Sequence, residues 1–203
     1  MPTKNSDLHG NAPDTSPVAV LIIDMISTFH FEDGEALFEQ TKLIVPKLAE
    51  LRRRCKQAHI PVVYVNDNYG KWQSDWSKLI ERCLESERGR QVLEHLHPDD
   101  DDYFVLKPKQ SGFFATTLET LLLHFKAHTL ILTGVAGDIC VLFTAHDAYM
   151  RDYHIVVPSD CIASNSAELT AQALDQMERV MKADVRPASE IDLERLKQPP
   201  EEE

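Results

Sequence analysis

Residues 18–24 constrain the fold more than any other segment, because six apolar residues run directly into a carboxylate. The segment reads VAVLIID. Continuous rather than alternating apolarity predicts a strand that is buried on both faces, as in the centre of a parallel sheet. Asp24 then follows the carboxyl end of that strand, where open α/β sheets form their sites. An Asp at this position can equally cap the next segment, so the position alone leaves both roles open.

Further short apolar runs alternate with segments of helical periodicity along the chain. This alternation predicts right-handed crossovers and a mostly parallel sheet with helices on both faces, which is the α/β class. Pro46 interrupts one helical segment and predicts a kink or two separate pieces. We expect strands at 60–66, 103–106, 130–132, 154–157 and, as a short sixth strand, 183–185, and helices at 35–56, 78–97 in part, 117–125, 140–150 and 166–181.

The length of 203 residues fits one domain. We expect that residues 17–192 form this domain, that residues 1–16 are a flexible polar arm, and that residues 193–203 are an acidic tail. The arm contains no apolar stretch of the kind that a secretory signal needs.

Charge and cysteine usage exclude several partners. A net charge of −12 argues against nucleic acid and anionic membranes as partners, and no apolar segment has the ~18–20 residues of a membrane span. The four cysteines include no C-x-x-C pair, which predicts free thiols in a reducing compartment, hence the cytoplasm, and no structural zinc site. The acidic run at 99–102 is expected to be a solvated loop.

Residues 129–150 combine a buried strand, a turn with two glycines, and a helix that begins near Cys140. Free N–H groups and the helix dipole at such a position favour the thiolate form of a cysteine. The alternative is that Cys140 is one more buried small residue. The chain lacks both the G-x-G-x-x-G and the P-loop pattern, so it has no phosphate cradle of either kind.

Asp24, Lys107 and Cys140 each follow a predicted buried strand, so all three are expected at one edge of the sheet. Together they suit nucleophilic catalysis. Asp24 can act as general base and acid, Lys107 can stabilise the thiolate, and Cys140 can attack a carbonyl carbon. Backbone N–H groups of the turn would face the developing oxyanion.

The candidate pocket residues lie in the loops around these strand ends. Phe29, Trp72, Trp76 and Phe113 are candidate walls, and Asn66 is a candidate polar contact. Each can also be ordinary packing. Such a pocket favours a small, planar or partly apolar substrate with an amide or related carbonyl.

Three motifs in order carry a resemblance to a known family. They are LIIDM at 21–25 with Phe29; KPKQSGF at 107–113; and LTGVAGDICV at 132–141, with Thr144, Ala145 and Ala148 behind it and VVPSD at 156–160. In these residues the sequence resembles the isochorismatase-like cysteine hydrolases, which include nicotinamidases and N-carbamoylsarcosine amidases. The resemblance extends from about Pro17 to about Asp192.

The resemblance implies a Rossmann-like α/β/α sandwich with a six-stranded, mostly parallel sheet, and a triad of Cys140, Asp24 and Lys107. Lys107 is favoured over Lys109 because the family's lysine directly follows the strand. The resemblance also implies a cis peptide between Val135 and Ala136, with the N–H groups of Ala136 and Cys140 directed at the oxyanion. It further implies a hydrolase of C–N bonds in a small molecule, without a cofactor, in a homodimer or homotetramer.

Departures from the family bear on the substrate. Nicotinamidases resemble one another in a metal-binding Asp and His set after the second strand, but residues 66–70 read NDNYG, which argues against a metal and against nicotinamide. Gly137 stands where relatives often carry Thr. Two alternatives remain: a vinyl-ether hydrolase of isochorismatase type, which uses Asp24 and Lys107, and a catalytically silent binding or scaffold member.

Overall fold

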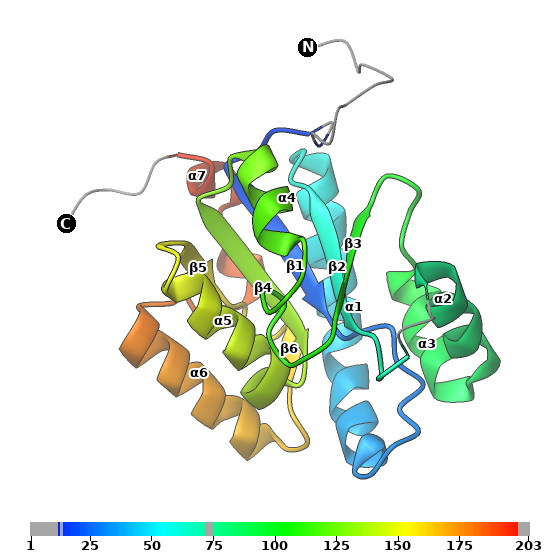
Figure 1. Ribbon diagram of the computed structural model, residues 1–203. Helices are drawn as coiled ribbons and strands as arrows, with labels where there is room; N and C mark the ends of the chain where they lie inside the picture. The colour runs from blue at the N-terminus through cyan, green and yellow to red at the C-terminus, as the bar shows by residue number, and fades with distance from the viewer. Residues whose placement is uncertain (1–11, 13, 72–74, 199–203) are drawn as a thin grey trace.

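The computed structural model describes residue 12 and residues 14–71 and 75–198. In this part of the chain a six-stranded parallel sheet lies between two layers of helices (Figure 1), so the predicted α/β sandwich is confirmed. The strand order is β3-β2-β1-β4-β5, and β6 pairs with the end of β4. The strands are β1 (Val18–Ile23), β2 (Val62–Asp67), β3 (Tyr103–Lys107), β4 (Thr129–Val135), β5 (His154–Val156) and β6 (Ile162–Ala163).

Two separate hydrophobic clusters define the two helical layers. One layer contains α1 (Gly34–Gln57), α2 (Trp76–Glu85), α3 (Glu87–Leu96) and α7 (Leu193–Leu196). The other contains α4 (Leu118–Phe125), α5 (Leu142–Tyr149) and α6 (Ala167–Met181). A π-helical turn at Gly137–Val141 precedes α5, and a 3₁₀ turn at Ala188–Glu190 precedes α7.

The first strand explains why the sheet must be covered on both faces. Val18, Val20 and Ile22 of β1 pack in the α1 layer, whereas Ala19, Leu21 and Ile23 pack in the opposite layer. All six residues are fully buried. Each large aliphatic side chain buried in this way stabilises the fold by about 1.5–3 kcal/mol. The prediction of a central strand is therefore confirmed.

Two expectations of secondary structure are corrected. Pro46 does not divide its helix into two pieces: α1 continues through it, and buried Ile44, Val45 and Leu48 hold both sides of the proline on the sheet. Residues 183–185 form no strand; Asp184 makes a single bridge to Val156. The sixth strand is instead the two-residue β6, which the sequence analysis did not assign to any element.

At both ends of the described chain, residues that were expected to belong to the flexible arm or the tail pack against the domain. Ser16 is buried, and Asp14 accepts a hydrogen bond from the Tyr103 hydroxyl at 2.5 Å. At the other end, Leu193 is buried in the α1 layer. Most of the expected arm, and residues 199–203 of the expected tail, lie outside the described residues.

All four cysteines lie in described parts of the chain and are free thiols, as predicted. Within the described residues, no helix has both the length and the apolarity needed to cross a bilayer.

Parallel register brings the strand ends to one edge of the sheet. Ile23 pairs with Gly134 of β4, and Asp67 of β2 pairs with Lys107 of β3. Asp24 follows β1, and its N–H still bonds to the Val65 carbonyl at 2.9 Å. Gly134 has a φ of 104°, and a Cβ placed there would lie 2.0 Å from the Ile23 carbonyl oxygen. A glycine is therefore required where β4 approaches the end of β1.

Gly134→Ala is expected to lower the free energy of unfolding by about 3 kcal/mol or more, because positive φ and overlap with the Ile23 backbone add together. Gly70→Ala is the matched control, since Gly70 also has positive φ (68°) but a Cβ there would meet nothing within 4 Å. The control is expected to cost about 1 kcal/mol. Urea denaturation measures both values, and equal losses would contradict the steric argument.

Candidate active site

Three of the residues singled out in the sequence meet at this edge of the sheet. The Lys107 ammonium lies 2.8 Å from the Asp24 carboxylate (Oδ2) and 3.4 Å from the Cys140 sulfur. The Lys107 side chain is completely buried, whereas Cys140 is partly exposed. The other oxygen of Asp24 accepts a hydrogen bond from the Asp67 N–H at 2.6 Å. The structure therefore places a thiol, a carboxylate and an ammonium in mutual contact.

Burial and charge set the protonation of this group. Burial raises the pKa of Asp24, although Lys107 and the donors to its carboxylate oppose the rise. Burial alone would lower the pKa of Lys107, but the charge of Asp24, followed by Cys140, raises it overall. Burial and the Asp24 charge raise the pKa of the Cys140 thiol, and Lys107 offsets this only in part. Burial and the Asp24 charge therefore oppose the thiolate form that Lys107 and the helix N-terminus would favour.

The two donors to Asp24 indicate where the shared proton lies at rest. The carboxylate accepts hydrogen bonds from Lys107 at 2.8 Å and from the Asp67 N–H at 2.6 Å, whereas the longer contact of Lys107 is to the sulfur. Hydrogen bonds to the charged form of a group favour that form. These contacts favour a neutral Cys140 thiol beside an Asp24–Lys107 ion pair.

The turn before Cys140 has the cis peptide between Val135 and Ala136 that the family resemblance implies. The helix after it begins earlier than predicted, with a π-helical turn at Gly137–Val141. The Ala136 carbonyl accepts N–H bonds from Ile139 and Val141, each at 3.1 Å, which are the residues on either side of Cys140.

Thr144 connects this turn to the loop that follows Lys107. Its hydroxyl donates to the Cys140 carbonyl at 2.7 Å and accepts from the Gly112 N–H at 3.0 Å. A Cβ at Gly112 would lie 2.9 Å from a Val65 methyl, so this loop approaches β2 closely. The sequence analysis assigned no role to Thr144. Its position one helical turn after Cys140 could have indicated that its hydroxyl bonds to the Cys140 carbonyl.

Asn66 was a candidate substrate contact, but its amide is already engaged on both sides. Its oxygen accepts from the Ile26 N–H, and its nitrogen donates to the Ile26 carbonyl, both at 3.0 Å. Asn66 is completely buried. It therefore fixes the loop after β1 beside β2. Sequence reasoning also overlooked Tyr69, whose hydroxyl donates to the same Ile26 carbonyl at 3.3 Å.

The aromatic candidates do not converge on one wall. Phe29 is completely buried, with its ring 5.3 Å from that of Phe38. Trp76 stacks on Phe104 at 5.1 Å and also contacts Tyr64.

Phe113 is buried beneath the Arg151 guanidinium, which lies 4.9 Å from its ring. Trp72 lies outside the described residues. For Phe29, Trp76 and Phe113, packing accounts for the contacts that the structure describes.

A cavity of about 780 Å³ lies beside the loop after β1. Its lining includes none of the three polar residues at the strand ends. The lining residues are Phe29, His30, Phe31, Asp33, Gly34, Glu35, Ala36 and Arg88.

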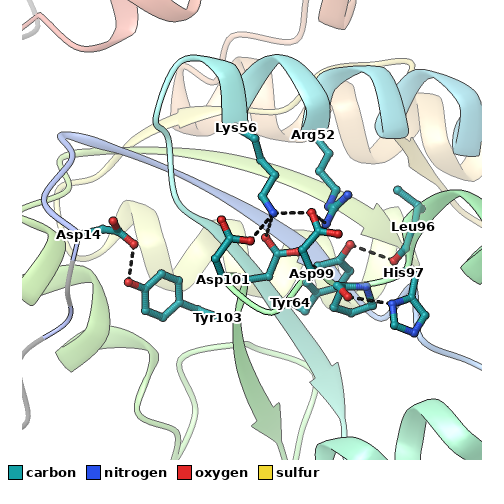
Figure 2. A network of polar contacts seen from close by, with 11 residues as sticks. Asp14, Arg52, Lys56, Tyr64, Leu96, His97, Asp99, Asp101 and Tyr103 are labelled. Atoms are coloured by element: carbon teal, nitrogen blue, oxygen red, sulfur yellow. Dashed lines mark hydrogen bonds and ion pairs between the residues drawn. The ribbon is translucent and has the colours of Figure 1, made fainter. Parts of the chain in front are cut away.

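Asp99, Asp101 and Asp102 of the acidic run before β3 form a group of carboxylates whose spacing would suit a metal ion. Figure 2 shows that Lys56 of α1 points into this cluster. Its ammonium lies within 3.0 Å of Asp99, Asp101 and Asp102, and Arg52 also contacts Asp99 and Asp102. Lys56 and Arg52 thus offset part of the negative charge of this cluster. The expectation of a solvated loop is wrong for Asp102, whose side chain is 1% exposed.

Comparison with known proteins gives a consistent result. A family model described as the isochorismatase domain matches residues 18–187. YaaI of Bacillus subtilis, an uncharacterized isochorismatase family protein, is 46% identical over 173 residues, which cover 85% of this chain and 95% of YaaI. Enterobactin synthase component B of Escherichia coli is 34% identical over 161 residues, which cover 74% of this chain and 54% of that protein.

Among solved structures, N-carbamoylsarcosine amidase from Thermoplasma acidophilum superimposes with a TM-score of 0.65 at 28% identity. The match covers 86% of this chain and 98% of the amidase.

Iodoacetamide is expected to alkylate Cys140 before the other three cysteines, because those three are completely buried. The rate is expected to rise about tenfold per pH unit between pH 7 and pH 9, because the thiolate reacts and the pKa of this thiol is raised. Mass spectrometry of digests taken over time measures the rate at each cysteine. A rate that reaches a plateau below pH 8 would contradict the neutral resting thiol.

Proposed function

The chain belongs to the isochorismatase family, and we propose that it hydrolyses a C–N bond, of amide or carbamoyl type, in a small molecule through the thiol of Cys140. The observation that carries this proposal is the Lys107 ammonium, which contacts both the Asp24 carboxylate and the Cys140 sulfur. A thiol, a base and a buried cation in contact are the parts that covalent catalysis by cysteine requires.

In the first half of the reaction, Asp24 takes the proton from the Cys140 thiol as the sulfur attacks the carbonyl carbon. A C–S bond forms, and the π electrons of the carbonyl move to its oxygen. The C–N bond then breaks, and the proton on Asp24 passes to the leaving nitrogen. The raised pKa of Asp24 suits this exchange, because a carboxyl group that both accepts and returns a proton works best when its pKa approaches the working pH.

In the second half, water attacks the thioester carbon and Asp24 takes a proton from that water. The C–S bond breaks, the acid product leaves, and the proton returns from Asp24 to the sulfur. Lys107 remains charged throughout, and it attracts Asp24 or the sulfur whenever either of them carries a negative charge.

The N–H groups of Ala136 and Cys140 are proposed to stabilise the oxyanion. The bonds from Ile139 and Val141 to the Ala136 carbonyl support this role, because they fix the turn on both sides of Cys140. Fixed donors of this kind stabilise developing charge without reorganising during the reaction.

We further propose that the chain forms a homo-oligomer through the exposed face of the Cys140 helix. Ile139, Phe143 and Met150 recur at helical spacing and are 45%, 53% and 70% exposed. Large apolar side chains exposed together on one helix are typical of an interface. Sedimentation velocity is expected to show a dimer or tetramer, and Phe143→Asp is expected to shift it toward the monomer; a wild-type chain that sediments as a monomer would contradict this.

Cys140→Ala is expected to lower turnover roughly 1,000-fold or more, because it removes the nucleophile. The measurement is ammonia release from nicotinamide, carbamoylated amines and ureido acids. Cys83→Ala, at a buried cysteine of α2, is the matched control and is expected to keep its activity. Urea denaturation checks that both variants are folded.

Substantial residual turnover in Cys140→Ala would instead favour hydrolysis by Asp24 and Lys107 without a covalent intermediate. Absence of turnover by the wild-type chain on every amide of the panel would favour a silent binding member.

A further inference from the structure

The Lys107 ammonium faces a third acceptor that the proposed hydrolysis does not use. In the described part of the chain, the charged and titratable groups that face it are Asp24 from the end of β1, Cys140 from the turn after β4, and Asp67 from the end of β2. Asp67 Oδ2 lies 3.6 Å from the ammonium, beyond the 2.8 Å of Asp24 and the 3.4 Å of Cys140. An ammonium has three N–H donors, so one is available for each neighbour.

The charge on these neighbours changes during the reaction. Before the attack, the proposed mechanism has Asp24 as the carboxylate that accepts the thiol proton, and the Asp67 carboxylate lies beside the same ammonium. When the sulfur has attacked and the tetrahedral intermediate has formed, Asp24 holds the thiol proton and the sulfur is bonded to carbon, so both are neutral. The oxyanion lies at the backbone N–H groups of the turn. At that stage Asp67 is the remaining carboxylate beside a completely buried ammonium.

We propose that Asp67 is a positioning residue that keeps the Lys107 side chain charged and in place while Asp24 and Cys140 are neutral. The proposal rests on the proposed function for its place in the reaction. Its physical basis is the cost of a buried charge without a counter-ion, which is high enough to move the side chain or expel its proton.

Local structure holds Asp67 in this position. It pairs with Lys107 in the parallel register of β2 and β3. Its carboxylate accepts a hydrogen bond from the Tyr69 N–H at 2.5 Å through the oxygen that does not face Lys107. Its own N–H donates to Asp24 at 2.6 Å, so one residue supports both members of the ion pair. Its side chain is 31% exposed, which lets water share the charge.

Asp67→Asn removes the charge and preserves the backbone N–H and the oxygen that Tyr69 uses. We expect kcat to fall roughly 10-fold to 100-fold and KM to change less than about threefold. The alkaline limb of the kcat profile is expected to move to lower pH by about one unit, because Lys107 loses a neighbour that favours its proton. Asp67→Glu restores the charge and is expected to recover part of this shift.

Asp152→Asn is the matched control. It removes the same charge from an exposed turn before β5, at the opposite edge of the sheet. Its alkaline limb is expected to coincide with that of the wild-type chain. If Asp67→Asn lowers kcat at every pH but leaves the alkaline limb at the wild-type position, Asp67 has a merely structural role. That result would overturn the proposal.

A second measurement needs no substrate. Asp24→Asn replaces the carboxylate at position 24 with a neutral amide, which mimics the protonated Asp24 of the intermediate. Asp67 is then the remaining carboxylate beside Lys107. Asp67→Asn is therefore expected to lower the urea midpoint more in the Asp24→Asn background than in the wild-type background. Equal decreases in the two backgrounds would overturn the proposal. A wild-type chain that releases no ammonia would instead end the proposed function, and the comparison of midpoints would still decide the role of Asp67.

Discussion

The burial of the Lys107 ammonium is the constraint on which the candidate active site depends. A completely buried cation is tolerated only beside anions, and the parallel register supplies them from the ends of β1 and β2. The strands that carry Asp24, Asp67 and Lys107 are neighbours in the order β3-β2-β1. The same contacts that make the charge tolerable also hold the Asp24 carboxylate beside the Cys140 thiol. In the proposed mechanism, stability and chemistry therefore depend on the same atoms.

Much of the fold could be predicted from the sequence because burial leaves a direct signature. The unbroken apolar run of β1 indicated a central strand, and its side chains do enter both layers. The errors arose where tertiary contacts decide. Pro46 lacks one N–H, but packing on either side of it keeps α1 continuous. The two residues of β6 carry too little pattern to identify, since their pairing with β4 depends on where the preceding loop places them.

The candidate site was predictable in its plan but not in its details. Polar residues at the ends of buried strands marked Asp24, Lys107 and Cys140, because parallel strands share one carboxyl edge. Residue type alone could not assign partners across strands, so Asn66 was considered a substrate contact although its amide is occupied by Ile26. Residue type alone also could not decide which of several opposing influences sets the pKa of the Cys140 thiol. The helix and Lys107 favour a thiolate at Cys140, but burial and Asp24 favour the thiol more strongly.

The paired hydrogen bonds between Asn66 and Ile26 have a consequence for how this scaffold can diversify. One amide contacts both the N–H and the carbonyl of a single residue, as an additional strand residue would, and so fixes the root of the loop after β1 independently of the loop's own sequence. The chain re-enters regular structure at Gly34, where α1 begins. Residues 27–33 are thus anchored at both ends, with Phe29 completely buried between the anchors and residues 30–33 exposed. Sequence changes among the exposed residues would leave the geometry of Asp24, earlier in the chain, in place.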